Sequence, residues 1–531
     1  MKLSALDLVI IGAYAIAIFV LAQWVARDKS GRGKSSGDYF LASRSLPWWA
    51  IGASLIASNI SAEQIIGMSG SGYAIGLAIA SYEWMAAATL LVVGKWILPV
   101  FLHNRIATMP QFLEQRYGPS IRNLMAVFWL ALYVFVNLTS IAWLGSIAVN
   151  KIAGVDQGAA LWMLAGFALL YQLYGGLKAV AMTDIVQVAL LVSGGLLVSG
   201  LTLDKIGGAD GIVAGFHTLV ARAPGHFHMI LEPEHPFYRD LPGLSVLIGG
   251  MWLANLSYWG FNQYIIQRAL AARDLDQAQK GVIFAAFLKL LMPVIIVLPG
   301  IAAVVLAPEL SRPDEAYPTM MHLLPPGILG LVFSALIAAV ISSMASKINS
   351  IAAIFTLDLF DKHWPVAGGG AGSDPDPERE RRLVRVGRIA ATAAVVLAAT
   401  TARPLLGESD QAFQFIQEFT GFFTPGITAI FLLGLFWSRA NEAGAIAAAV
   451  ASVACSYLLK SLWPSLPFLD RMGWVFVAAM ALAAAVSLLV KPRPGANKVD
   501  LGGVGFRTST GFNVAALAVI AVLVALYATW W

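Results

Sequence analysis

The chain has 531 residues and a formal net charge of +5; 58% of its residues are hydrophobic and 12% are charged. A soluble protein of this size would carry about twice that charged fraction, so the composition excludes an ordinary soluble domain and predicts a polytopic membrane protein. The single cysteine, Cys455, excludes an intrachain disulfide.

Apolar segments of roughly the 20 residues that a bilayer requires recur along the whole chain. We predict an all-α polytopic membrane protein with about fourteen transmembrane helices. The predicted spans lie at about 5–26, 46–71, 79–102, 123–149, 158–175, 180–203, 245–267, 279–306, 327–357, 383–401, 411–437, 441–462, 471–490 and 511–530.

The distribution of lysine and arginine predicts how these spans are oriented. If the N-terminus lies outside, the inner connections hold 23 of the 35 basic residues, and the outer connections hold nine. Basic residues are retained on the cytoplasmic side of a membrane. We therefore expect a multi-pass protein of the cell (inner) membrane with both termini on the extracytoplasmic side.

Two of the predicted spans are interrupted by polar residues. In 46–71 the apolar sequence is broken around Asn59 and Gln64, and in 245–267 it is broken around Asn255. Backbone polar groups cannot be left bare in hydrocarbon, so such a break is tolerated only where it lines a cavity or binds something. Discontinuous helices at matching positions of two halves are typical of inverted-repeat transporters with a site at the midplane.

Five polar residues stand inside five different predicted spans: Gln64, Glu83, Asn255, Lys289 and Gln417. A charged residue at the centre of a membrane helix costs roughly 2.5–3.5 kcal/mol. One interpretation is that each side chain only links neighbouring helices through hydrogen bonds. The five together supply both donors and acceptors, which favours a shared site for a neutral polyhydroxyl ligand.

A serine cluster in VISSMASKINS raises the question of an ion site. Ser342 and Ser343 are adjacent, and Ser346 follows one turn after Ser342. Hydroxyls and freed backbone carbonyls are hard oxygen ligands, which suit a small cation such as Na⁺. From the residues alone, serines that bond the preceding helical turn are the favoured interpretation.

These residues occur within longer motifs: SNISAEQIIGMSGSGYAIGLAIASYEW, GGLKAVAMTDIVQV, NLSYWGFNQYIIQRALAA, VISSMASKINS, IQEFTGFFTPGI and GLFWSRANEAGA. In these motifs the chain resembles the sodium:solute symporter family, and within it the sodium/glucose cotransporter branch, with bacterial sodium/galactose symporters as the nearest likeness.

The resemblance implies a fold of the leucine-transporter type, a five-plus-five inverted repeat with one helix before it and three after. The implied division is an extra helix and cytoplasmic loop at 1–45, a first repeat at 46–203, an outer loop at 204–244, a second repeat at 245–437 and three C-terminal helices at 438–531.

The resemblance also implies the role of individual residues. The sugar-coordinating positions of the family fall on Gln64, Glu83, Asn255, Lys289 and Gln417, with Asn59 nearby and with Tyr82 and Trp259 lining the pocket. Tyr258 matches an inner aromatic gate, and Met68 and Phe413 match an outer hydrophobic gate. Ala86 stands where the sugar relative has a serine, which leaves the choice of hexose open.

For sodium, the resemblance implies ligands from the carbonyls of Ala57, Ile60 and Ala339 and from the hydroxyls of Ser342 and Ser343. Asp184 matches an acidic residue linked to sodium release. This reverses the interpretation of the two serines as packing residues.

The expected function is sodium-coupled import of a neutral hexose, galactose or glucose, by alternating access, with Na⁺ and the lipid bilayer as partners and no nucleic acid. Myo-inositol, sialic acid or an amino acid is the alternative solute. A membrane sensor and a membrane enzyme using Glu83 and Lys289 are less favoured: we see no kinase-sized extension and no nucleophile, and we expect no enzymatic activity.

Overall fold

The computed structural model describes residues 3–26, 46–106, 108–174, 177–364, 377–409, 411–491 and 499–531, without the side chains at 19, 21–26, 173, 174, 177–184 and 377–380. Within these ranges the regular structure is helical, and the only strand-like pairing is an isolated bridge between Leu46 and Ala272. This confirms the predicted all-α class.

The first half of the described chain forms helices that alternate between long spans and short broken pieces. They are α1 (Ala5–Ala26), α3 (Trp48–Asn59), η2 (Glu63–Met68), α4 (Ser69–Ala74), η3 (Leu77–Ala80), α5 (Ser81–Val92), η4 (Val93–Ile97), α6 (Leu98–His103), α7 (Met109–Arg116), α8 (Pro119–Ala131), η5 (Leu132–Leu138), α9 (Thr139–Ala153), α10 (Gln157–Tyr174), α11 (Leu177–Gly207), η6 (Gly208–Asp210), α12 (Gly211–Arg222) and η7 (Pro224–His226).

The second half is built in the same way. It comprises α13 (Ser245–Ile248), α14 (Gly250–Leu256), η8 (Ser257–Phe261), α15 (Gln263–Leu270), α16 (Leu275–Leu306), η9 (Pro313–Glu315), α17 (Ala316–Met321), α18 (Ile328–Ala353), η10 (Ile354–Phe360), α19 (Asp361–His363), α20 (Pro377–Leu406), α21 (Ala412–Thr420), α22 (Thr424–Phe436), α23 (Glu442–Leu462), α24 (Phe468–Leu489) and α25 (Thr510–Thr529).

Among the described residues, nine helical segments are long and apolar enough to cross a membrane. A tenth is formed if α21 and α22, which meet at an angle of 45°, are one broken span. The chain is therefore a multi-pass membrane protein. The count of about fourteen spans stays a prediction, because several predicted spans are present as short or broken helices.

Both predicted broken spans contain a real break in the helical backbone, but the second break is not at Asn255, which lies within α14 (Gly250–Leu256). The helix α3 ends at Asn59, and Ile60 is extended, with φ −67° and ψ 113°. In the second segment η8 ends at Phe261, and Asn262 is extended in nearly the same way, with φ −83° and ψ 121°. Each break exposes backbone groups inside the molecule, where they are available to a ligand.

The long helix α16 holds the two halves together. It begins after Asp274, whose side chain caps the helix by accepting a hydrogen bond from the backbone N–H of Gln277 over 2.9 Å. It packs against α3, α4 and α5. The approach is close: a Cβ atom at Gly300 would collide with the carbonyl oxygen of Ser69.

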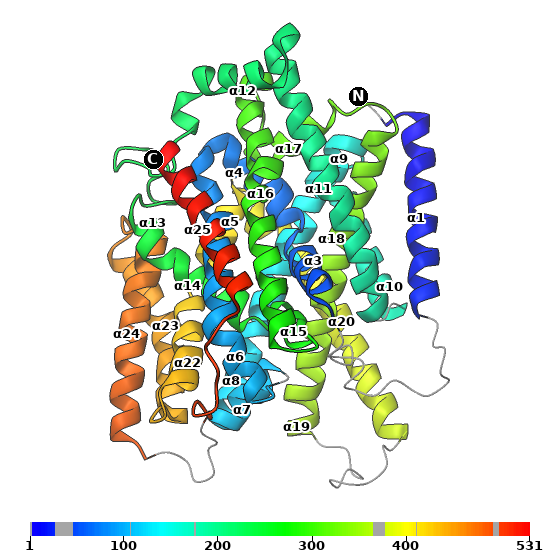
Figure 1. Ribbon diagram of the computed structural model, residues 1–531. Helices are drawn as coiled ribbons and strands as arrows, with labels where there is room; N and C mark the ends of the chain where they lie inside the picture. The colour runs from blue at the N-terminus through cyan, green and yellow to red at the C-terminus, as the bar shows by residue number, and fades with distance from the viewer. Residues whose placement is uncertain are drawn as a thin grey trace.

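In the view of Figure 1, α16, α3 and α15 lie near the middle, and α1 and α24 lie at opposite margins. Both ends of the chain lie toward the end of the molecule that carries α12 (Figure 1).

Candidate functional site

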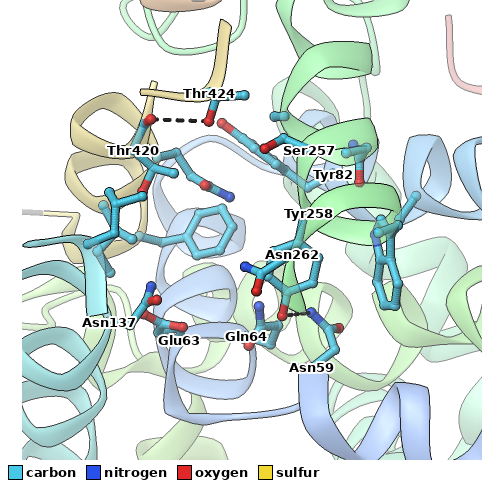
Figure 2. A pocket seen from close by; sticks show the side chains of 18 of the residues that line it. Asn59, Glu63, Gln64, Tyr82, Asn137, Ser257, Tyr258, Asn262, Thr420 and Thr424 are labelled. Carbon is cyan, nitrogen blue, oxygen red and sulfur yellow. Dashed lines mark hydrogen bonds between the residues drawn. The ribbon is translucent and has the colours of Figure 1, made fainter. Parts of the chain in front are cut away.

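A cavity of about 130 Å³ lies where the broken helices meet α5, α16 and α21. All of the residues predicted to bind or gate a solute line it: Asn59, Gln64, Met68, Tyr82, Glu83, Asn255, Tyr258, Trp259, Lys289, Phe413 and Gln417. Residues as far apart in the sequence as Asn59 and Gln417 are thus brought to one place. Figure 2 shows this pocket with Asn59, Gln64 and Tyr258 grouped on one side and Thr420 on another.

An ion pair crosses the cavity wall between α16 and α5. The ammonium of Lys289 lies 2.6 Å from a carboxylate oxygen of Glu83, and both side chains are almost fully buried. Lys289 also donates a hydrogen bond to the side-chain oxygen of Asn59. Each buried charge therefore has an opposite charge beside it, which offsets part of the cost of removing it from water.

The hydrogen bonds continue from Asn59 to the predicted inner gate. The Asn59 amide donates to the Tyr258 hydroxyl over 3.1 Å (Figure 2). That hydroxyl lies 2.5 Å from the hydroxyl of Tyr264 on α15. A chain of polar contacts therefore runs from Glu83 through Lys289, Asn59 and Tyr258 to Tyr264, and it spans both helix breaks.

Aromatic rings supply the apolar part of the cavity. The rings of Tyr82 and Phe413 pack edge to face, with centroids 5.1 Å apart. On another wall Tyr258 and Trp259 pack edge to face at 5.2 Å, and the Lys289 ammonium lies 5.0 Å from the centre of a Trp259 ring. Aromatic faces beside hydrogen-bonding groups suit a ligand with apolar C–H faces and a polar rim.

The remaining predicted residues sit at the same cavity with local partners. Gln64 accepts a hydrogen bond from the Ser61 hydroxyl over 2.8 Å, and Asn255 donates to the carbonyl of Met251 over 3.1 Å. Ala86 also lines the cavity and contributes only a methyl group. The binding and gating roles of these residues stay predictions.

The structure adds polar lining residues that the sequence reasoning missed. Glu63 is buried and accepts a hydrogen bond from Ser140, and Figure 2 shows it beside Asn137. Tyr133 donates to the side chain of Asn262 over 3.0 Å. Asn262 had a detectable signal, because it is a polar residue at the second interruption. Asn137 and Tyr133 stand in an ordinary apolar span and had none.

A second, much smaller cavity of about 10 Å³ lies between α3 and α18. Four of the five predicted sodium ligands line it: Ala57, Ala339, Ser342 and Ser343. The fifth, Ile60, is the extended residue at the end of α3. The donor set of hydroxyls and carbonyls fits a hard monovalent cation. The described residues contain no cluster of three or more histidine, cysteine or acidic side chains that would suit a transition metal.

Asp184 was predicted to act in sodium release. Its backbone belongs to α11, but its side chain lies outside the described part of the structure. Its role stays a prediction.

The family model for the sodium:solute symporter family matches residues 39–451, which is most of the chain and includes all of the residues predicted to bind solute or sodium. The chain belongs to this family. The resemblance predicted from the sequence motifs is therefore confirmed.

Several relatives extend this result. Over 547 aligned positions the chain is 48% identical to a sodium/glucose cotransporter of Vibrio parahaemolyticus, covering 100% of this chain and 99% of the relative. It is 32% identical to sodium/myo-inositol cotransporter 2 of Mus musculus, covering 83% of this chain and 67% of the relative. It is 30% identical to sodium/glucose cotransporter 1 of Ovis aries, covering 83% and 69%. The family and these relatives are transporters.

The fold is similar to that of a Na⁺-coupled sialic acid symporter solved in a substrate-bound outward-open state. The TM-score is 0.75 at 22% sequence identity, over 92% of this chain and 99% of that chain. At this identity the likeness shows the fold alone. It confirms the predicted leucine-transporter type of architecture.

Proposed function

We propose that this protein is a sodium-coupled symporter that imports a neutral hexose, galactose or glucose, by alternating access. One observation supports it above all. The hydrogen-bonding groups of five separate helical segments meet aromatic rings in one cavity, and a serine-lined pocket lies at the break of the same helix α3. Full-length similarity to a sodium/glucose cotransporter supports the same function.

The charge balance of the large cavity favours a neutral substrate. Lys289 is already paired with Glu83, so it does not offer an uncompensated positive charge. A carboxylate ligand such as sialic acid would meet the negative charge of Glu83 without a free cation to offset it. A sugar hydroxyl can both donate to Glu83 and accept from Lys289, because it has one donor and two acceptor sites.

Coupling follows from the position of the small pocket. Na⁺ bound in this pocket joins α3 to α18, because residues of both helices line it. The break after Asn59 connects this pocket to the sugar cavity, because Ala57 lines one and Asn59 lines the other. Each ligand then changes the affinity for the other by the same factor. Asp184 accepts the ion as it leaves toward the cytoplasm.

The second candidate substrate is myo-inositol, which is also a neutral ring with several hydroxyls. It is favoured by the 32% identity to a sodium/myo-inositol cotransporter. Ala86 brings no hydroxyl to the cavity wall. A ligand beside Ala86 therefore receives one hydrogen bond fewer than it would beside a serine. This difference changes the relative affinity for closely related polyols.

We further propose the topology implied by the family. The repeats are 46–203 and 245–437, the outer connection is 204–244, one helix precedes the repeats at 1–45, and three follow at 438–531. Both termini face the extracytoplasmic side of the inner membrane, in agreement with the excess of basic residues in the opposite connections.

The test is uptake into proteoliposomes that contain the purified protein. Labelled galactose, glucose and myo-inositol are each supplied with an inward gradient of NaCl or of choline chloride. We expect one of the hexoses to accumulate with NaCl and not with choline chloride. Preferential accumulation of myo-inositol would select the second candidate, and equal uptake in both salts would contradict sodium coupling.

A further inference from the structure

A second buried lysine lies beside the small pocket. Lys347 stands on α18, one helical turn after Ser343, and its side chain is 4% exposed. It lines the same pocket as Ala57, Ser342 and Ser343. A buried cation is costly unless it is paired or otherwise compensated. Its position in this pocket therefore requires an explanation.

The two buried lysines differ in how their charge is compensated. Lys289 forms an ion pair with Glu83 at 2.6 Å. No carboxylate lies within ion-pair distance of Lys347 among the residues that the structure describes. Its ammonium lies 4.2 Å from the centre of the Tyr264 ring, and the Glu63 carboxylate attracts it from farther away. The cation–π contact holds the ammonium in place, and the more distant Glu63 carboxylate offsets only part of its charge.

The part of the Lys347 charge that is not offset acts on any cation bound in the same pocket. Arg268 is a second basic side chain in the lining of the same pocket. Two like charges a few ångströms apart repel each other strongly when water does not screen them. A sodium ion between α3 and α18 is therefore bound against a fixed positive charge.

We propose that Lys347 places a positive charge beside the small pocket between α3 and α18, here called the sodium pocket. This charge lowers the affinity of the pocket for Na⁺ and promotes release of the ion. The inference rests on the proposed sodium site at Ser342 and Ser343. An importer must release the ion where sodium is scarce, so a pocket that binds too tightly would retain it. The charge of Lys347 keeps binding weak without removing an oxygen ligand.

The contact with Tyr264 also ties this cation to the sugar cavity. The ammonium of Lys347 lies over the ring of Tyr264, and the hydroxyl of Tyr264 lies 2.5 Å from the hydroxyl of Tyr258. Movement of Tyr258 during sugar passage therefore moves Tyr264, and with it the ring that holds the Lys347 ammonium. The side chain is a positioning residue for the ion and does not contact the sugar.

The experiment measures sodium binding without sugar. The melting temperature of the purified protein is followed as NaCl replaces choline chloride at constant ionic strength. In Lys347→Met the charge is lost and the length is kept, so we expect the half-saturating Na⁺ concentration to fall about tenfold. In Lys347→Arg the charge is kept, and we expect a value within about twofold of the wild type.

Lys95→Met is the matched control. Lys95 also lies over an aromatic ring, 5.2 Å from the centre of a Trp96 ring, but it does not line the sodium pocket. This variant should leave the titration unchanged. Lys347→Gln keeps a polar head group and replaces the methionine variant if that protein does not fold.

Ser343→Ala in the same titration separates the two hypotheses. If it loses the sodium response while Lys347→Met keeps the wild-type value, the sodium site stands and the role of Lys347 is refuted. If Ser343→Ala responds to sodium as the wild type does, the proposed site itself is wrong. An arginine variant that behaves like the methionine variant would also refute the inference, because charge would not be the cause.

Discussion

Lys289 and Glu83 form an ion pair at 2.6 Å across the wall of the solute cavity, with 1% and 4% of their side chains exposed. They are 206 positions apart in the chain. A buried ion pair adds little net stability compared with apolar residues of similar size, whereas removal of one partner leaves an uncompensated charge. The pair is therefore better explained by what it does for a polar solute than by its contribution to folding.

Replacing Lys289 by Ala should destabilise the protein by about 3–5 kcal/mol, because Glu83 is left buried without its cation. Sodium-driven sugar uptake should be lost. The double variant Lys289→Met with Glu83→Gln should recover most of the stability, since no charge remains, but not the uptake. Thermal unfolding in detergent and uptake in proteoliposomes test this. Wild-type transport by the double variant would show that the pair is only structural.

Replacing Ser343 by Ala should abolish sodium-driven uptake, because one hard oxygen ligand of the proposed ion is lost. Exchange of sugar without sodium should continue in part. Ser350→Ala is the matched control on α18, since that hydroxyl bonds the backbone carbonyl of Ser346 over 3.0 Å and does not line the sodium pocket. Sodium dependence equal to the wild type in Ser343→Ala would exclude this serine as a ligand.

Replacing Tyr258 by Phe keeps the aromatic ring but removes the hydroxyl that contacts Asn59 and Tyr264. Two buried polar groups then lose a partner, so we expect a loss of about 1–3 kcal/mol in the free energy of unfolding. Coupled uptake should fall because Asn59 also holds Lys289.

Tyr73→Phe is the comparison for this variant. Its hydroxyl makes an exposed hydrogen bond to the carbonyl of Pro308 over 2.7 Å, remote from the cavity lining. Stability and uptake should both stay near the wild type in this control. If Tyr258→Phe is equally silent, ring packing alone accounts for the residue.

Asp240, in the segment between α12 and α13, should make stability depend on pH. Burial, together with the nearby negative charge of Glu418, raises the pKa of Asp240 from its ordinary value of 3.8 to about 6. The folded state therefore holds the proton more tightly than the unfolded state. This contribution is fully present below about pH 4 and is lost as the pH rises through about 6.

We expect about 1–2 kcal/mol of stability to disappear across this interval, since Asp240 is partly exposed and its shift must be discounted. Asp240→Asn cannot titrate and should remove this part of the slope. Thermal unfolding between pH 4 and pH 7 measures the difference. Identical slopes in the two proteins would exclude Asp240 as the titrating group.

Much of this site could be predicted from the sequence because its signals are local. A polar residue in an apolar span is visible without knowledge of any neighbour, and this identified Glu83, Lys289 and Asn255. The helix break near Asn59 was visible for the same reason, since interrupted hydrophobicity is a property of a short segment. For the second span the sequence indicated an interruption around Asn255, and only the structure placed the break at Asn262. The ordered motifs then specified the family.

What the sequence determined by itself was the class of protein, the broken spans and the polar residues that membrane burial makes costly. Which residues meet was decided only by the tertiary structure. The pairing of Lys289 with Glu83, the contact between Tyr258 and Tyr264, and the place of Lys347 beside the sodium pocket depend on how each helix is rotated and packed. That rotation is set by contacts between distant segments, and no local pattern of residues encodes it.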